Sequence, residues 1–277
     1  MVDLTAIILT FNEEKNIIHC IESIRTIAKR IVVIDSFSTD NTVAIAKELG
    51  AEVYQHEFVN QAKQYIWGVE VADIRTKWVF RIDADERLTP ESSAEIQEIC
   101  RENENTDLNG IVVRFKVTFM GKDLRYGGYY PFCKLLVYKN GKAYMEDRGM
   151  DEHIILTEGR SVELQNDSLH CDYKGLSAWI DKHNKYASRE AEAYFHNSLE
   201  KKIEKGLNPR AKIKRFMKLR VYYKLPMGLR AHLYYIYRYY FKLGFLDGKE
   251  GKIFTFMQAY WYRYLVDAKI YEKRSEK

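Results

Sequence analysis

The chain has 277 residues, 46% of them hydrophobic, so it can bury a full core and is not expected to be disordered. No stretch approaches about 20 uninterrupted apolar residues, and the first residues turn acidic too early for a signal peptide. We therefore expect a protein that is made and kept in the cytoplasm. Its cysteines lack CxxC spacing, which argues against a zinc site or a disulfide framework. They are Cys20, Cys100, Cys133 and Cys171.

The formal net charge of +5 is unevenly distributed along the chain. Residues 200–277 hold 20 Lys and Arg against 7 Asp and Glu, whereas residues 1–199 hold 24 against 32. This uneven charge indicates two functional surfaces, of which the basic one faces an anionic partner. We therefore expect two domains, a larger one over 1–200 and a basic, tyrosine-rich helical tail over 201–277.

The first hundred residues alternate between predicted strands and helices. The strands are short apolar runs typical of strands buried on both faces, at residues 5–11, 30–35, 51–55 and 78–83. Helical patterns lie between them: one after Asn12, its expected N-cap, one over 43–49 and one over 61–71. This alternation predicts an α/β fold with a mostly parallel, doubly wound sheet flanked by helices.

Beyond residue 110 the pattern changes. The run IVVRFKVTF alternates between apolar and polar residues, and Asn140-Gly141 between two alternating runs indicates a hairpin. We expect a small antiparallel patch here. A helix is predicted over 175–200, with Trp179, Tyr186 and Ala187 among its packing residues, and a helical extension follows it.

Polar side chains cluster directly after three of the predicted parallel strands. Ligands of such sheets bind beyond the carboxyl ends of the strands, so three clusters at one edge predict a binding site. The clusters are Asn12, Glu13 and Glu14 after the first strand, Asp35, Ser36 and Ser38 after the second, and Asp83 and Asp85 after the fourth.

The stretch VFRIDADERLTP contains three acidic residues within four positions, Asp83, Asp85 and Glu86, and the helix that follows does not need them at its start. Thr89 and Pro90 already supply an N-cap and a proline at the first helical position. Residues two apart near a strand end project to the same side, about 6–7 Å apart. Asp83 and Asp85 could thus hold Mg²⁺ or Mn²⁺ against a bound diphosphate, which the chain has no glycine-rich loop to cradle. The alternative is a solvated acidic turn.

Four further residues are candidates, each with a structural alternative. Asp35 is suited to accept hydrogen bonds from a base or ribose, or it caps the next helix. Asp151 or Glu152 could act as general base on an acceptor hydroxyl, or the two form a surface acid pair. His170 could be a third metal ligand, or a histidine that is hydrogen-bonded in a structural role.

The tail mixes basic residues with tyrosines, in RAKIKRFMKLR (210–220), LYYIYRYYFKLGF (233–245) and YWYRYL (260–265). Such segments suit a membrane interface, where aromatic rings sit at headgroup level and cations meet anionic lipid. Packing of these helices on the core, or on another subunit in a homo-oligomer, is the alternative. We expect no nucleic-acid partner, because the tail carries no recognisable nucleic-acid-binding module.

Several stretches together resemble the inverting family 2 glycosyltransferases of the GT-A fold. The similarity is greatest to the bacterial branch that adds a sugar, often glucose, to the inner core of lipopolysaccharide or lipooligosaccharide. The matching stretches run over nearly the whole chain: ILTFNEEKNI, IVVIDSFSTDNTVAIAKELGAEV, WVFRIDADERLTPE, RYGGYYPFCKLLVYKNGKA, MDEH, LHCDYKGLSAWIDKHNKYA and GFLDGKEG.

The resemblance implies a role for each matching residue. Asp83 and Asp85 become the metal-binding DxD motif. Glu152 aligns with the acid of the family and is the implied catalytic base, while Asp151, where related sequences often have histidine, is the second candidate. The nucleotide contacts implied are Thr10, Phe11, Asn12 and Glu13 for the nucleoside, Asp35 for its base, and Lys63 and Asp83 for the rest of the nucleotide.

The activity implied is metal-dependent transfer of a hexose from a UDP-sugar, with inversion, to a lipid-linked glycan at the inner face of the cytoplasmic membrane. Two other interpretations of the residues stay open. A metal-dependent nucleotidyltransferase or phosphohydrolase could use the same sheet edge and acid pair. A non-enzymatic module could use the basic tail to dock on a membrane or on nucleic acid.

Overall fold

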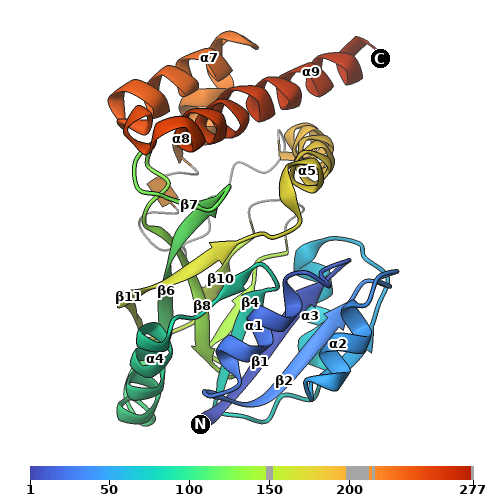
Figure 1. The fold of residues 1–277 in the computed structure, drawn as a ribbon, viewed down its shortest axis with the longest axis vertical. Coiled ribbons are helices and arrows are strands. Elements are labelled where there is room, and N and C mark those ends of the chain that lie inside the picture. The colour runs from blue at the N-terminus through green and yellow to red at the C-terminus, as the bar shows by residue number, and fades with distance from the viewer. Residues whose placement is uncertain (148–151, 198–211, 214–215, 276–277) are drawn as a thin grey trace. The chain divides into compact units, whose positions relative to one another are not determined.

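The computed structural model describes residues 1–147, 152–197, 212–213 and 216–275 of the chain (Figure 1). The chain forms two compact units. Unit 1 comprises Met1–Thr118 and Pro131–Tyr173, and unit 2 comprises Phe119–Tyr130 and Lys174–Lys277. The predicted boundary at residue 200 lies outside the described residues, so the division into a transferase domain and a tail stays a prediction.

The first half of unit 1 is a parallel sheet. Its strands β1 (Val2–Thr10), β2 (Ala28–Asp35), β3 (Glu52–Gln55) and β4 (Trp78–Asp83) lie in the order β3-β2-β1-β4. They are connected through α1 (Ile17–Ile24), α2 (Thr42–Glu48) and α3 (Gln61–Val71). The predicted α/β fold with a parallel, helix-flanked sheet is confirmed.

Asn12 does not cap the first helix. That helix begins at Ile17, after Asn16, while Asn12 lies in the left-handed region with φ of 53°. Its side-chain Oδ1 accepts a hydrogen bond from Thr39 N at 2.8 Å, so the side chain bridges two loops. The prediction failed because an asparagine before a helical pattern satisfies loop backbone as readily as helix backbone.

The second half of unit 1 extends the sheet with strands of both directions. α4 (Pro90–Glu102) starts as predicted, because Thr89 forms a capping box with Ser92. The sheet continues past β4 in the order β8-β6-β11-β5, in which β8 is antiparallel to both neighbours and β6 is parallel to β11. These strands are β5 (Glu86–Arg87), β6 (Leu108–Phe119), β8 (Phe132–Lys139) and β11 (Arg160–Cys171).

The predicted small antiparallel patch exists, but its pairing differs from the prediction. Gly141, at φ of 76°, makes the expected turn, and Lys142 N donates to Lys139 O at 2.9 Å. The strand after this turn, β9 (Ala143–Met145), pairs with β10 (Ile154–Leu156) in a separate two-stranded sheet. The hairpin prediction was wrong because β4 and β6 already occupy both edges of β8.

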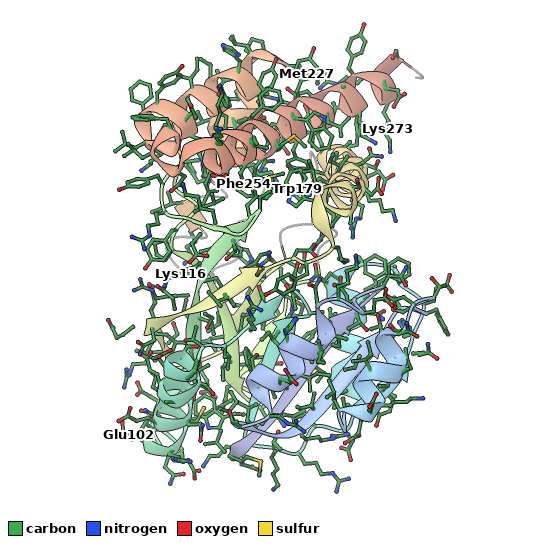
Figure 2. The ribbon with its side chains drawn as sticks, in the orientation of Figure 1. Glu102, Lys116, Trp179, Met227, Phe254 and Lys273 are labelled. Carbon is green, nitrogen blue, oxygen red and sulfur yellow. The ribbon has the colours of Figure 1, made fainter. Side chains whose placement is uncertain are left out.

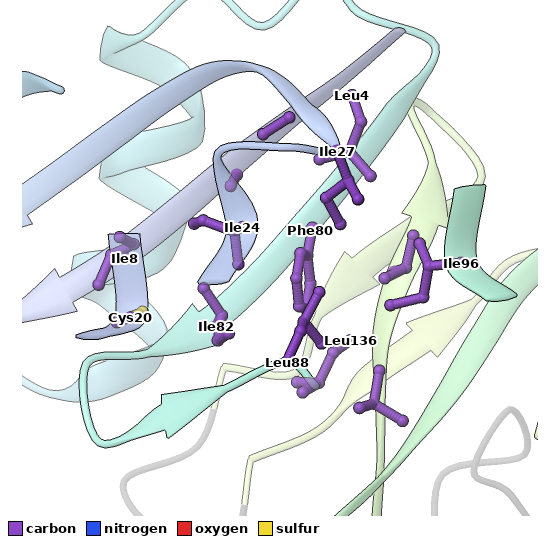
Figure 3. Packing of buried hydrophobic residues seen from close by; sticks show 14 of the residues in the cluster. Leu4, Ile8, Cys20, Ile24, Ile27, Phe80, Ile82, Leu88, Ile96 and Leu136 are labelled. Carbon is purple, nitrogen blue, oxygen red and sulfur yellow. The ribbon is translucent and has the colours of Figure 1, made fainter. Parts of the chain in front are cut away.

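Hydrophobic residues cover both faces of the parallel strands. Ile8, Phe80 and Ile82 pack with Ile24 of α1 in one cluster, and Figure 3 shows these side chains close together. Neighbouring residues of the same strands, among them Ile7 and Val79, join the cluster beneath α3. This two-sided burial explains why the strands read as continuous apolar runs.

Unit 2 is mainly helical, which confirms the predicted C-terminal helical extension. In α5, Ala187 and Ala191 are fully buried against α9, and Figure 2 labels Trp179 and Phe254, whose ring centroids lie 6.3 Å apart. None of the described helices is long and apolar enough to cross a bilayer. The α-helices are α5 (Gly175–Asn197), α7 (Leu229–Ile236), α8 (Gly248–Thr255) and α9 (Tyr262–Ser275), and the unit also contains the short strand β7 (Lys122–Leu124). Short π- and 3-10 segments lie between them: η1 (Met217–Val221), η2 (Tyr222–Lys224), η3 (Tyr237–Phe241), η4 (Gly244–Asp247) and η5 (Phe256–Trp261).

Candidate active site

The strand register brings the predicted site residues of unit 1 to one edge of the sheet. Asp35 at the end of β2 is paired with Thr10 of β1 on one side and with Gln55 of β3 on the other. Asp83 at the end of β4 is paired with Leu9 of β1. The carboxyl ends of four neighbouring strands therefore meet, and this is where ligands of such sheets bind.

Asp35 organises the loop that follows β2. Its carboxylate is buried and accepts hydrogen bonds from Thr10 Oγ1 at 3.0 Å, Gln55 Nε2 at 3.1 Å and Ser38 N at 2.9 Å. The Ser38 hydroxyl adds a fourth bond at 2.5 Å. Asp35 is thus held rigidly at the strand end, rather than serving as the N-cap of α2, which is Asn41. Its contact with a base remains a prediction.

The loop after β1 is fastened to the loop after β2. Asn12 N donates to Ser38 Oγ at 2.8 Å, and Glu13 N donates to Thr42 Oγ1 at 2.7 Å. Phe11, directly before them, keeps 49% of its surface exposed. Lys63 lies exposed on the first turn of α3, whose N-cap Asn60 accepts from its backbone N–H. The predicted nucleotide contacts therefore lie on loops and helix starts at this one edge.

The aspartates of the DxD motif occupy two different environments. Asp83 is the last residue of β4, whereas Asp85 lies in the tight turn before β5. The expectation that both project from one strand is therefore corrected, because the chain turns between them. Asp83 Oδ2 accepts from Lys134 Nζ at 3.0 Å, and its Oδ1 lies 3.3 Å from Arg81. Burial alone would raise the pKa of Asp83, but Lys134 and Arg81 hold it well below its usual range.

Lys134 of β8 joins two carboxylates of the acidic stretch. Its Nζ lies 2.6 Å from Glu86 Oε1 in addition to its bond with Asp83. The Glu86 side chain is fully buried and accepts from Asp83 N at 3.1 Å through its other oxygen. Burial by itself would lower the pKa of Lys134, but Asp83 and Glu86 raise it, so the lysine is charged. The repulsion among the crowded acids is offset by this cation.

His170 lies beside the second aspartate of the motif. The pairing of β11 with β5 sets His170 against Glu86, and His170 Nε2 lies 3.7 Å from Asp85 Oδ2. Its Nδ1 is buried and faces Glu86 Oε1 at 3.6 Å. Burial would lower the pKa of His170, yet Asp85 and Glu86 outweigh it and raise the pKa. The predicted third metal ligand thus lies next to the motif.

The residues present fit a divalent cation whose remaining coordination positions are filled by the phosphates of a sugar donor and by water. Among the residues that the structure describes, no three His, Cys, Asp or Glu side chains form a metal-binding group by themselves. Mg²⁺ and Mn²⁺ sites commonly use one or two protein ligands together with substrate phosphates and water. The facing atoms of Asp85 and His170 offer such a pair. The buried, unsatisfied Nδ1 of His170 faces Glu86, the arrangement that commonly orients a ligating imidazole.

The two candidate bases differ in what the structure says of them. Asp151 lies outside the described residues. Glu152 directly precedes His153 and β10. Burial alone would lower the pKa of Arg81, but the carboxylates of Asp83 and Glu152 raise it. Glu152 is therefore electrostatically linked to the residue that holds Asp83.

Sequence reasoning missed Arg81, Glu86 and Lys134. Arg81 is a buried cation in the apolar strand WVFRID, and Lys134 is a half-buried one in FCKLLVY. A charge inside a strand that is otherwise buried requires a partner, because burying an unpaired charge is costly. That signal was present in the sequence, but it does not say which acids are the partners.

Comparison with known proteins identifies the family. Residues 5–150 match the model of "Glycosyl transferase family 2". The lipopolysaccharide core biosynthesis glycosyltransferase LpsC of Rhizobium meliloti is 25% identical over 99% of this chain and 94% of its own. An uncharacterized glycosyltransferase of Rickettsia felis is 28% identical over 69% of this chain and 70% of its own.

A solved structure shares the fold over nearly the full length. It is the mannosyltransferase PcManGT of Pyrobaculum calidifontis, in complex with GDP-Man and Mn²⁺, at a TM-score of 0.57, 15% identity and coverage of 98% of this chain and 88% of that one. The expected GT-A fold is thereby confirmed. Of the activities that the residues left open, the family match selects sugar transfer over nucleotidyl transfer, phosphoester hydrolysis or passive docking. The chain is a glycosyltransferase that belongs to glycosyl transferase family 2.

Proposed function

We propose that this enzyme transfers a hexose, preferably glucose, from a UDP-sugar to a hydroxyl of a lipid-linked glycan such as the lipopolysaccharide core. The observation that carries the proposal is the pairing of Asp85 with His170, 3.7 Å apart, at the carboxyl edge of the sheet and beside the loops after β1 and β2. The similarity to LpsC over almost the whole of both chains supports the class of acceptor.

In this proposal, Asp85 and His170 hold Mg²⁺ or Mn²⁺, with Asp83 beside them. The ion would supply positive charge against the donor diphosphate. Glu86 keeps the imidazole of His170 oriented, and Lys134 keeps the carboxylates of Asp83 and Glu86 in place. The loops that contain Thr10, Phe11, Asn12 and Glu13, together with Asp35 and Lys63, bind the nucleotide.

The protein's part in the chemistry is positioning and proton removal. Glu152, or Asp151 in its place, takes the proton from the acceptor hydroxyl as the hydroxyl oxygen forms a bond to the anomeric carbon. The bond between that carbon and the diphosphate oxygen breaks on the opposite face, so the configuration inverts. Arg81 and Lys134, which contact Asp83, would supply positive charge that favours the departing diphosphate.

The proposed acceptor places the enzyme at the inner face of the cytoplasmic membrane, as a peripheral protein. The basic, tyrosine-rich segments of unit 2 support this location, because cations and aromatic rings favour the headgroup region. Self-association through the same segments is the competing use of that surface.

A nucleotide-sugar panel tests the proposal. Thermal unfolding is followed with UDP-glucose, other UDP-hexoses and GDP-mannose, each with Mn²⁺ present or chelated, since a ligand of the folded state raises the melting temperature. We expect UDP-glucose to give the largest rise and chelation to abolish it. A rise in melting temperature with GDP-mannose alone would refute UDP-glucose as the donor. Hydrolysis of the donor without transfer to any glycolipid would refute the lipid-linked glycan as the acceptor.

A further inference from the structure

Among the described residues of unit 2, two groups of basic residues have different structural roles. One group pairs with buried carboxylates and stabilises the helices: the buried Arg230 pairs with Asp267, while the half-buried Arg263 and Lys218 lie 2.9 and 2.8 Å from the buried carboxylate of Glu190. These cations are occupied inside the unit. They cannot also form the anion-binding surface that the charge of the tail suggests.

The second group lies on the surface next to exposed apolar side chains. Lys249, Lys252, Ile253 and Phe256 follow one another at helical spacing over α8 and η5, and all four are exposed. Within the described part of the chain, neither of these lysines, nor the exposed Lys242, forms an ion pair. One helical face therefore offers unpaired positive charge together with apolar surface.

Aromatic rings join this face to η3 and η4. The ring of Phe256 lies 6.3 Å from that of Tyr235, which stacks on Tyr239 at 5.4 Å. Tyr239 in turn contacts Tyr240 at 5.1 Å and Phe245 at 6.1 Å. Because each distance is that of neighbouring rings, these residues form one connected cluster, in which Tyr240, Phe245 and Phe256 are exposed and Tyr235 and Tyr239 are half-buried.

Exposed apolar side chains flank the turn between η3 and η4, at the last residue of η3 and on η4. Phe241 is 75% exposed and Leu246 is 50% exposed, with Leu243 between them at φ of 58°. The backbone of the turn is nevertheless fixed. Gly127 N donates to Lys242 O at 2.8 Å, and the buried carboxylate of Asp247 accepts from Tyr126 N at 2.9 Å. The protein thus holds apolar side chains outward on a fixed turn.

We propose that this docking surface, the exposed side chains of residues 235–256, binds an anionic phospholipid membrane. Apolar side chains at a rigid turn, tyrosine rings behind them and lysines without acidic partners match the layers of an anionic bilayer surface. Phe241 and Leu246 enter the acyl boundary, the tyrosine rings lie at headgroup level, and Lys242, Lys249 and Lys252 meet lipid phosphates. Membrane binding would bring the enzyme to the proposed lipid-linked acceptor, so its biological purpose rests on the proposed function. The binding itself is argued from the surface alone.

Vesicle flotation of the full chain tests the surface without donor or acceptor. We expect binding to equimolar phosphatidylcholine and phosphatidylglycerol vesicles, weaker binding at high salt, and little binding to phosphatidylcholine alone. Phe241→Gln with Leu246→Gln should weaken binding about tenfold or more. Each of Lys242→Ser, Lys249→Ser and Lys252→Ser should weaken it about fivefold on anionic vesicles.

Matched controls keep the test specific to the docking surface. Tyr271, 69% exposed on α9, and the exposed Lys224 lie elsewhere in unit 2, so Tyr271→Gln and Lys224→Ser should bind as the parent does. Thermal unfolding shows that each variant is folded. Equal binding by the docking-surface variants and the controls would overturn the inference. The inference would also be overturned if light scattering without lipid shows a dimer of the parent that Phe241→Gln with Leu246→Gln dissociates, because the surface would then be a dimer interface. Vesicle binding by a protein that transfers no sugar would refute the proposed function alone.

Discussion

The imidazole Nε2 of His170 lies 3.7 Å from Oδ2 of Asp85, although 85 positions separate the two residues in the chain. The short strand β5 brings them together, because it pairs with β11 and sets Glu86 opposite His170. This distance is too long for a direct hydrogen bond, so the two groups face each other without bonding. The metal site proposed above therefore combines the acidic stretch after β4 with a residue from a distant strand.

The first prediction concerns this pair. Asp85→Asn and His170→Ala should each abolish the rise in melting temperature that Mn²⁺ produces together with UDP-glucose, since each removes a proposed ligand of the ion. Transfer should fall about 100-fold or more, because even residues that only support metal ligands commonly contribute 10–100-fold. His19→Ala, at an exposed histidine of α1, is the matched control and should keep the response. A full Mn²⁺ response in His170→Ala would show that this histidine is structural.

The second prediction concerns Lys134. Lys134→Met leaves the fully buried carboxylate of Glu86 without its cation and should lower the free energy of unfolding by about 3–5 kcal/mol. Adding Glu86→Gln removes the stranded charge and should restore part of the stability but not the Mn²⁺ response. Lys116→Met, on β6, removes a more exposed lysine 3.6 Å from Asp167 and should cost less than about 1 kcal/mol. Urea unfolding of the parent and these three variants measures the differences. Equal losses of unfolding free energy in Lys134→Met and Lys116→Met would refute the role of Lys134 in neutralising Glu86.

The third prediction separates the candidate bases. If Glu152 takes the acceptor proton, Glu152→Gln should lower kcat by a factor of about 10²–10⁴. The thermal response to UDP-glucose should persist, since donor binding does not need the base. Asp151→Asn should then change kcat much less. The reverse order would assign the base to Asp151, and a lost donor response in Glu152→Gln would make Glu152 part of the donor site.

The parallel half of the fold could be predicted because its strands are buried on both faces. Ile8 and Phe80 lie in one core cluster and Ile7 and Val79 in the other, so each strand appears in the sequence as an apolar run bounded by polar residues. The pairing of β9 could not be predicted in this way. A turn at Gly141 indicates that the chain reverses, but not that the edges of the preceding strand are already taken.

The site could be predicted to the same extent, and for the same reason. Asp35 and Asp83 end buried strands, so the sequence alone locates them at the edge where sheets of this kind bind ligands. Lys134 and Glu86 make contacts across strands that are distant in the chain, and periodicity carries no information on such pairs. The sequence shows that Lys134 is a charge inside an apolar strand. Only the strand order β4-β8-β6-β11-β5 shows which acids it contacts.

The last prediction concerns acid stability and His183 of α5. The His183 ring stacks on Trp179 with centroids 3.5 Å apart, and its Nδ1 donates to Trp179 O at 2.8 Å. Burial lowers the pKa of His183 to about 4, and the nearby charges of Lys182 and Arg263 act in the same direction against the hydrogen bonds that favour the charged form.

The sign of the effect follows from that pKa. At a pH between about 4 and the usual histidine value of about 6.5, the unfolded chain binds a proton that the folded chain does not. The contribution of His183 to stability is therefore complete above pH 6.5 and is lost as the pH falls toward 4, a loss of up to about 3 kcal/mol. His183→Phe keeps a ring on Trp179 but cannot titrate. Its unfolding free energy, measured by urea denaturation, should fall less steeply over this range than that of the parent, whereas parallel pH curves would show that His183 is already charged in the folded protein.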